Sequence, residues 1–173
     1  MKFLIVISLL LCSCGASVEQ MVDKVLHGKI TGIEDPRTGC NTHPELVPYI
    51  RDFEEEYGRG IGDIPICVGD RLYPANMEEP LNTVGVCLKW TSPIRIYKAI
   101  IVRTSWFNDN KHDRYAMRQL IEHELGHCAL NRVHNSKVDA NGKQVSIMFP
   151  ISFSGRHYRD NHQYYLDELF NRL

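Results

Sequence analysis

Apolar positions in the first half of the chain predict one helix followed by short strands. The helix is predicted where apolar side chains recur every three or four residues and a glycine follows, at Leu46, Ile50, Phe53, Tyr57 and Gly58. Pro44 and Pro48 leave the start of this helix open, because proline lacks the N–H that a helix interior needs. The glutamates at 54–56 are interpreted as a solvated face of this helix.

Strands are predicted where β-branched and other apolar residues run together or alternate. Residues 24–33 are a weak candidate, 64–68 a short buried strand, 84–90 a half-exposed strand and 95–103 a longer one. The segments 35–41 and 69–83 are predicted as loops. Three aromatic residues are expected in the core or in the wall of a cleft, namely Trp90, Trp106 and Phe107.

A longer helix is predicted to begin near Asp113, which is a plausible N-cap. A helix turns by about 100° per residue, so three apolar side chains would share its core face. These are Ile121, Leu125 and Cys128. Gly126 would let another backbone pack closely against the helix. Asn131 is a suitable terminator, because asparagine tolerates the left-handed conformation that follows a helix C-terminus.

The last part of the chain predicts a loop and then a helix. Residues 135–145 are polar, with a tight turn at 139–143. A terminal helix is predicted from the spacing of Leu166, Leu169, Phe170 and Leu173. Together these elements predict an α+β fold with a small twisted mixed sheet, a backing helix and a C-terminal helix. Residues 24–173 would form one domain, which is long enough to enclose a core.

The net charge of the chain and its first residues indicate which partners and which cellular location to expect. The chain has 20 Lys and Arg against 21 Asp and Glu, a net charge of −1, so no basic footprint for nucleic acid is present. Residues 1–13 contain one lysine, an apolar run and then small residues. This pattern predicts a secretory signal peptide that is too short to span a membrane as a stable helix. Residues 14–23 are interpreted as a polar tether.

The end of this leader, Leu11-Cys12-Ser13-Cys14, resembles a bacterial lipobox, whose last cysteine is lipidated after cleavage. The resemblance implies an exported protein held at a membrane by lipid on Cys14. Gly15 follows rather than Asp, which favours the outer membrane or the cell surface. A plain signal peptide cut nearby, giving a periplasmic or secreted protein, is the alternative.

Export implies an oxidising compartment, so the remaining cysteines are expected to form up to two disulfides. The sequence leaves all three pairings open among Cys40, Cys67, Cys87 and Cys128. Cys128 would point about 140° away from His123, so packing or a disulfide is expected there rather than metal binding. Cys40 has no surrounding motif that would make it an inhibitory metal ligand.

The motif that carries chemistry is His123-Glu124-Leu125-Gly126-His127, which matches H-E-x-x-H. Two histidines four residues apart project from nearly the same side of a helix and can bind one Zn²⁺. Glu124 lies about 100° round from His123, beside the metal, where a carboxylate can accept a proton from an attacking water. The alternative is a helix with two histidines on a polar face.

With the residues that follow, this motif resembles the metzincin zinc endopeptidases, nearest the matrixin-like branch. Their pattern is H-E-x-x-H-x-x-G-x-x-H followed by a methionine turn. Here His134 follows, and then the segment 146–150, Ser-Ile-Met-Phe-Pro. Two departures stand out: Asn131 replaces the glycine, and the interval from His127 to His134 is one residue longer than in the pattern.

The resemblance implies one catalytic zinc ion bound by three histidines, His123, His127 and His134. Glu124 would be the general base, and Met148 would form an apolar floor beneath the metal. Pro150 and its neighbours would line the pocket for the substrate residue after the cut bond. Because of the longer interval, three other residues stay open as the third ligand, namely His157, His162 and Asp139.

The expected activity is therefore hydrolysis of peptide bonds in peptide or protein substrates by a monomeric enzyme. The strand at 84–90 is expected to pair with an extended substrate. A second hypothesis is a surface lipoprotein that serves as a binding module, with a vestigial or structural zinc site. A zinc hydrolase acting on non-protein amides is a third.

Overall fold

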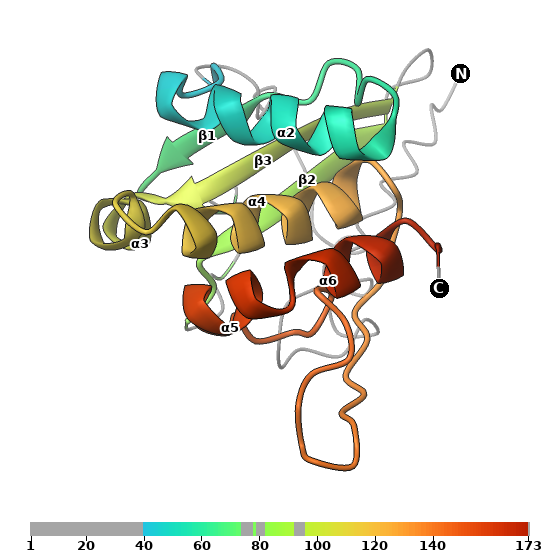
Figure 1. Ribbon diagram of the computed structural model, residues 1–173. Coiled ribbons are helices and arrows are strands. Elements are labelled where there is room, and N and C mark those ends of the chain that lie inside the picture. Colours follow the sequence, from blue (N-terminus) through green and yellow to red (C-terminus); the bar gives the residue numbers. More distant parts are fainter. Residues whose placement is uncertain (1–39, 74–77, 79–81, 92–95, 173) are drawn as a thin grey trace.

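The computed structural model describes residues 40–73, 78, 82–91 and 96–172. Helices cover one face of a small sheet (Figure 1). The strands are β1 (Ile66–Gly69), β2 (Gly85–Thr91) and β3 (Ile96–Arg103). The helices are η1 (Pro44–Leu46), α2 (Val47–Tyr57), α3 (Thr104–Asn110), α4 (Arg114–Cys128), α5 (Gly155–Asp160) and α6 (His162–Leu169). The predicted signal peptide, Cys14, the tether and the strand at 24–33 lie outside the described residues.

The sheet is mixed, as predicted. Its order is β1-β3-β2, with β1 parallel and β2 antiparallel to β3. The strand boundaries lie within two residues of those expected from the sequence. β2 therefore lies at one edge of the three described strands, next to helix α4, with which it shares many contacts.

The prediction that 84–90 is a half-exposed strand is wrong, because both faces of β2 are covered along residues 85–88. On one face Cys87 joins the main core beneath α4. On the other face Val86 and Leu88 pack with Leu72 and Tyr73 in a second apolar cluster. The covering residues come from the segment at 69–83 that was predicted as a loop, and the strand pattern does not reveal them.

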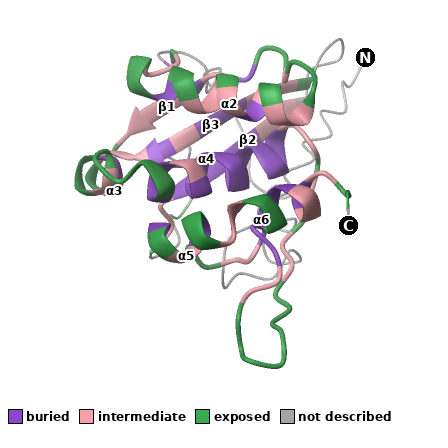
Figure 2. Cartoon of the chain, viewed as in Figure 1, coloured by how far each residue is buried: buried purple, intermediate pink, exposed green. Residues whose placement is uncertain are grey.

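Helix α4 is the most deeply buried element in the described chain (Figure 2). Asp113 is its N-cap, as predicted, and its carboxylate accepts hydrogen bonds from the N–H groups of Tyr115 and Ala116, both at 3.0 Å. The predicted core face is confirmed, since Ile121, Leu125 and Cys128 are fully buried. Residues 119–128 are all buried, so the second half of the helix is covered on every side.

The side of α4 that faces away from the sheet is covered by the returning chain. Met148 packs against Gly126, so that a Cβ atom on Gly126 would lie 2.5 Å from the Met148 sulfur. The expectation of a closely packed backbone at Gly126 is wrong, since a buried side chain fills this space. Further back along α4, the Ser152 hydroxyl donates to Gln119 Oε1 at 2.7 Å. Gly155, at the start of α5, then packs against the first turn of α4.

A buried ion pair fixes the same helix to its neighbours. The Glu122 carboxylate is fully buried and accepts a hydrogen bond from Arg118 Nε at 2.6 Å and another from the Tyr158 hydroxyl of α5. Arg118 also lies 3.8 Å from Asp52 of α2. Because every charge in this network has a partner, the desolvation of Glu122 is offset.

The C-terminal helix is confirmed, and two shorter helices were not predicted. Leu166 and Leu169 of α6 are buried, as expected. Helices α3 and α5 have seven and six residues, too few to give a clear apolar period. The expected core position of Phe107 is confirmed, and Trp106 packs against the same core from α3.

Two disulfides are formed, Cys40–Cys67 and Cys87–Cys128. The first joins residue 40 to β1. The second joins β2 to the last residue of α4. Cys128 is therefore a structural cysteine, as expected, and Cys40 is not a free thiol.

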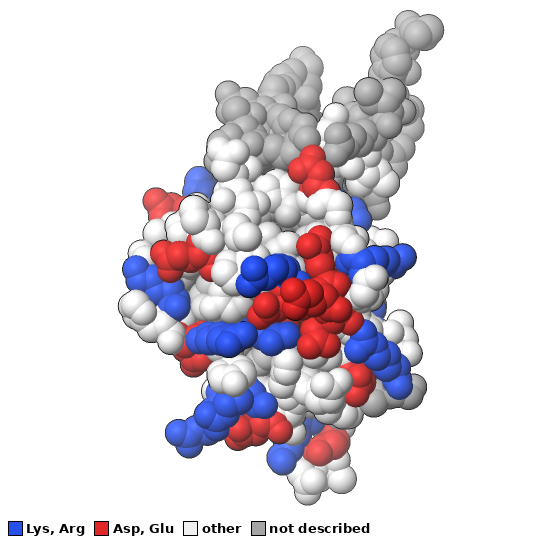
Figure 3. Space-filling view, turned by 45° about the horizontal axis from the view of Figure 1, so that its top comes forward, with Lys and Arg blue, Asp and Glu red and all other residues white. Residues whose placement is uncertain are grey.

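The surface carries charges of both signs. On the face drawn in Figure 3, acidic and basic side chains lie next to one another. Ion pairs between described residues include Arg114–Asp52 at 3.2 Å. Along the part of the chain that the structure describes, no helix is both long enough and apolar enough to cross a bilayer.

The packing of Met148 on Gly126 generates a stability prediction. Gly126→Ala should lower the free energy of unfolding by about 1–3 kcal/mol, because the added methyl group overpacks a filled site. This loss should appear although alanine is favoured over glycine in helix interiors by about 1 kcal/mol. Urea titration followed by circular dichroism measures the change. The control is Gly60→Ala, whose new methyl group meets only Glu54 Oε1 at 3.4 Å. Equal stability of the two variants would contradict the packing.

Candidate metal centre

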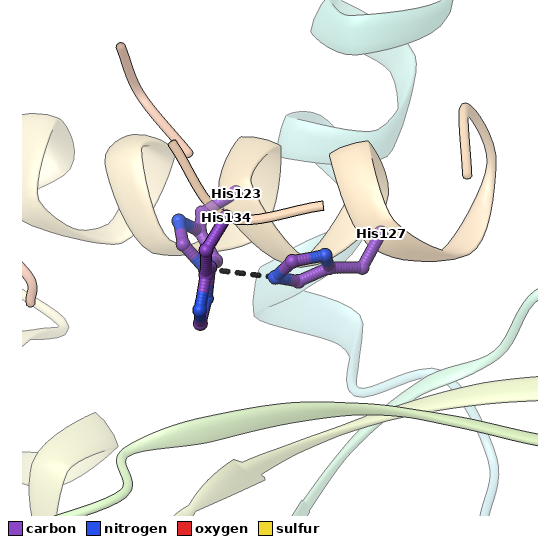
Figure 4. A group of neighbouring side chains, drawn as sticks. All are labelled: His123, His127 and His134. Atoms are coloured by element: carbon purple, nitrogen blue, oxygen red, sulfur yellow. Dashed lines mark hydrogen bonds between the residues drawn. The ribbon is translucent and has the colours of Figure 1, made fainter. Parts of the chain in front are cut away.

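Three imidazole rings converge on one point beside α4 (Figure 4). His123 and His127 come from successive turns of the helix, and His134 comes from the loop that follows it. The ligand atoms of the three side chains lie within 4.8 Å of one another. Among the described residues this is the single group of three or more metal-ligating side chains so placed. The three histidines are therefore close enough to bind one metal ion.

The distances between the ring nitrogens suit a shared metal. His123 Nε2 lies 3.1 Å from His127 Nε2 and 3.2 Å from His134 Nε2. Two nitrogens bound to one tetrahedral ion at 2.0–2.1 Å would lie about 3.3 Å apart. These two separations therefore match those of a tetrahedral coordination shell to within about 0.2 Å, and all three ligand atoms lie within 4.8 Å of one another.

Backbone carbonyls orient two of the rings. His123 Nδ1–H donates to the carbonyl of Ile147 at 2.8 Å, and His127 Nδ1–H donates to the carbonyl of Arg132 at 2.7 Å. A carbonyl oxygen only accepts, so the proton of each neutral ring lies on Nδ1. The lone pair on each Nε2 is left free and points toward the centre of the cluster, as a metal ligand requires.

Burial keeps these rings neutral. Desolvation, reinforced by the neighbouring His127, lowers the pKa of His123 to about 3. Desolvation also lowers the pKa of His127 to about 4, against the opposing hydrogen bond to the Arg132 carbonyl. The pKa of His134 is lowered by burial as well. All three rings are therefore uncharged near neutral pH, the form in which imidazole binds a metal.

The extra residue between His127 and His134 is absorbed in the turn after α4. Leu130 N–H donates to the Leu125 carbonyl. Arg132 N–H donates to the Gly126 carbonyl at 2.9 Å, and this second bond joins residues six positions apart. The closing bond of a usual helix-end motif spans five. Asn131 adopts the left-handed conformation expected for it, with φ of 56°. The wider turn brings His134 back to the cluster.

Glu124 is buried between α4 and the edge strand. The residue is 5% exposed, and burial raises the pKa of its carboxyl to about 8, partly opposed by a hydrogen bond from the backbone N–H of Cys87. A Cβ atom on Gly85 would lie 2.9 Å from Glu124 Oε1. Gly85 therefore provides the space in which this carboxylate lies.

The methionine-turn residues lie against the same helix. Met148 is fully buried and packs against Gly126. Gly126 lies between the two helical histidines in the sequence. Its own N–H donates to Ser146 Oγ at 3.0 Å. Pro150 is half-buried and precedes the segment that contacts Gln119. Its role beside a substrate stays a prediction.

The three residues left open as alternative third metal ligands interact with other groups. His157 Nε2 bonds to the Tyr165 hydroxyl at 2.7 Å. His162 Nε2 lies 3.9 Å from the Glu122 carboxylate. Asp139 Oδ1 accepts N–H groups within its own tight turn, and these bonds lower the pKa of its carboxyl. None of the three belongs to the histidine cluster.

Sequence reasoning missed the groups that support the site. Gly85 carried a usable signal, since a glycine inside a strand marks close approach by another group. The carbonyls of Ile147 and Arg132 carried none, because any residue has a carbonyl and its direction depends on the local turn.

Comparison of the chain with protein-family models, with curated proteins and with solved structures found no match.

The geometry predicts that His134 contributes to metal binding as much as the helical pair. His134→Ala should weaken Zn²⁺ or Co²⁺ binding by more than about 100-fold, since even loss of a supporting residue behind a ligand costs 10–100-fold. Titration against a chelating dye measures the affinity. His157→Ala is the matched control and should bind as the unaltered protein does. If His157→Ala abolished binding and His134→Ala did not, the assignment would be reversed.

Proposed function

We propose that this protein is an exported zinc-dependent endopeptidase with a metzincin-like active site. The observation that supports it best is the cluster of three neutral imidazoles, two of which come from the helix that also carries Glu124. The motif order of helix, third histidine and methionine turn supports the same proposal.

Zinc is the proposed ion because of the donor set. Imidazole nitrogen suits zinc, and three protein ligands in a tetrahedral arrangement are typical of catalytic zinc sites, which keep a fourth position open. A zinc ion bound here would supply Lewis-acid chemistry, polarising a substrate carbonyl and making a nearby water more acidic. The residues that would hold it are His123, His127 and His134.

Glu124 is the proposed proton carrier. Its carboxyl is buried, and burial raises its pKa to about 8, which brings the group close to the range in which it gives up and takes back a proton at neutral pH. Positive charge near it would favour the ionised form. The carboxylate would then accept a proton from the attacking water and pass it to the leaving amine. The N–H of Cys87 and the space at Gly85 hold the group in place.

The proposed substrate is an extended peptide segment. Among the described strands, none pairs with the second edge of β2, and this strand lies against α4 beside Glu124. An extended peptide adding to this edge would lie next to the proposed base. If the site is metzincin-like, Met148 forms the floor of the metal site, and Pro150 belongs to the wall of the pocket that binds the substrate residue after the cut bond. Secretion and a lipid anchor at Cys14 complete the proposal.

The base assignment predicts that Glu124→Gln keeps the metal and loses cleavage. The amide preserves the size of the side chain but cannot take a proton, so cleavage should fall by at least about 100-fold. Bound zinc is measured by metal analysis and cleavage with a quenched-fluorescent peptide library. Full activity in this variant would exclude Glu124 as the base. Bound zinc without cleavage of any peptide by the unaltered protein would favour the alternative, a surface lipoprotein with a structural metal site.

The space at Gly85 gives an independent prediction. Gly85→Ala should displace the flexible Glu124 carboxylate, because the new methyl group would lie 2.9 Å from its Oε1. Cleavage should fall by about 10-fold or more, while zinc affinity stays unchanged, as misplacing a reacting group is costly. The matched control is Gly69→Ala, another strand glycine, whose methyl group would meet Ile101 at 3.4 Å. Equal activity of both variants would contradict the proposed position of the base.

A further inference from the structure

The two loops that orient the metal ligands converge on one carboxylate of the C-terminal helix. The first loop contains Arg132, whose carbonyl accepts the Nδ1–H of His127. The second is the segment that begins at Ser146, in which the Ile147 carbonyl accepts the Nδ1–H of His123. Neither loop belongs to a helix or strand. Backbone hydrogen bonds such as that from Arg132 N–H to the Gly126 carbonyl hold them in part, and side-chain contacts supply the rest.

Glu168 of α6 joins these loops through its two oxygens. Its Oε1 accepts a hydrogen bond from Arg132 Nη2 at 2.5 Å, and its Oε2 accepts one from Ser146 Oγ at 2.7 Å. The Glu168 side chain is 13% exposed and that of Arg132 22% exposed, so water screens this pair only in part. Ser146 is fully buried and also accepts the N–H of Met148.

Arg132 is held on a second side by the end of α6. Its Nη1 donates to the carbonyls of Glu168 and Leu169 at 3.1 and 2.9 Å and to Asn171 Oδ1 at 3.0 Å. These carbonyls lie at the helix C-terminus, where a cation is favoured. The guanidinium group is therefore fixed by several directed bonds, and the backbone carbonyl of the same residue is fixed with it.

We propose that Glu168 is a positioning residue for the metal centre, acting through Arg132 on His127 and through Ser146 on the segment that orients His123. It touches neither ring. The inference depends on the metal-binding part of the proposed function and not on peptide cleavage. It assigns the C-terminal helix a role in setting metal affinity, besides its role in the core.

The test compares Glu168→Gln with Asp167→Asn in the full-length protein. Both remove one carboxylate from α6, but Asp167 interacts with Gln163 and Arg172 on the surface and with neither loop. Co²⁺ is the probe, because its absorption spectrum reports ligand geometry as well as binding. Glu168→Gln should bind Co²⁺ about 10-fold more weakly, within the range for residues that support ligands, and with an altered spectrum. Asp167→Asn should match the unaltered protein in both.

Thermal unfolding without metal separates positioning from general stability. Ser146→Ala is the second variant if Glu168→Gln does not fold, since it removes the hydrogen bond between Ser146 and Glu168. Weaker Co²⁺ binding with an altered spectrum, beyond what Asp167→Asn shows, supports the proposal. An unchanged Co²⁺ affinity and an unchanged Co²⁺ spectrum in Glu168→Gln or Ser146→Ala overturn the role of Glu168 but do not contradict the metal site itself. Absence of Co²⁺ and Zn²⁺ binding by the unaltered protein overturns the metal site and this inference together.

Discussion

The site depends on three neutral imidazole nitrogens that face one another at close range. His123 Nε2 lies 3.1 and 3.2 Å from its two neighbours, and the Nδ1 atoms of two rings are committed to carbonyls. The Nε2 lone pairs of His123 and His127 face each other at 3.1 Å with no proton on either nitrogen, which is costly in a buried place. A proton on His134 Nε2 could bridge only one pair of nitrogens, whereas a metal ion would accept a lone pair from each of the three rings. This arrangement supports the proposal that the cluster binds a metal ion.

The fold holds this arrangement by burying α4 on both sides. The Cys87–Cys128 disulfide joins the helix to β2, and Lys98 Nζ donates to the Cys128 carbonyl at 2.6 Å at the helix end. On the other side the returning chain fills the space beside Gly126 with Met148. Since rotation or sliding of the helix would break contacts on both sides, the two histidines and Glu124 keep their relative positions. The catalytic proposal requires this rigidity, because two of the three proposed ligands and the proposed base come from the same helix.

Much of this could be predicted from the sequence, because the strongest signals are local. Asp113 caps α4, and Asn131 adopts the left-handed conformation in the turn after it, as their side chains indicated. The H-E-x-x-H spacing placed two rings on one side of the helix. The resemblance favoured His134 as the third ligand but left its alternatives open, since its position depends on how the turn after α4 absorbs one extra residue. That outcome is decided by backbone hydrogen bonds, which no side-chain pattern encodes.

The errors of prediction have a common physical origin in contacts between distant segments. β2 is covered on its second face by Leu72 and Tyr73, which its own alternation does not reveal. Gly126 receives a side chain from a segment more than twenty residues later in the chain.

The central claim is that three imidazoles of one chain bind a single ion. X-ray absorption spectroscopy at the zinc edge of the purified, zinc-loaded protein tests it most directly. The account predicts one ion per chain with three imidazole ligands at about 2.0–2.1 Å and one further light-atom ligand. A shell with sulfur ligands, or with fewer than three imidazoles, would contradict it.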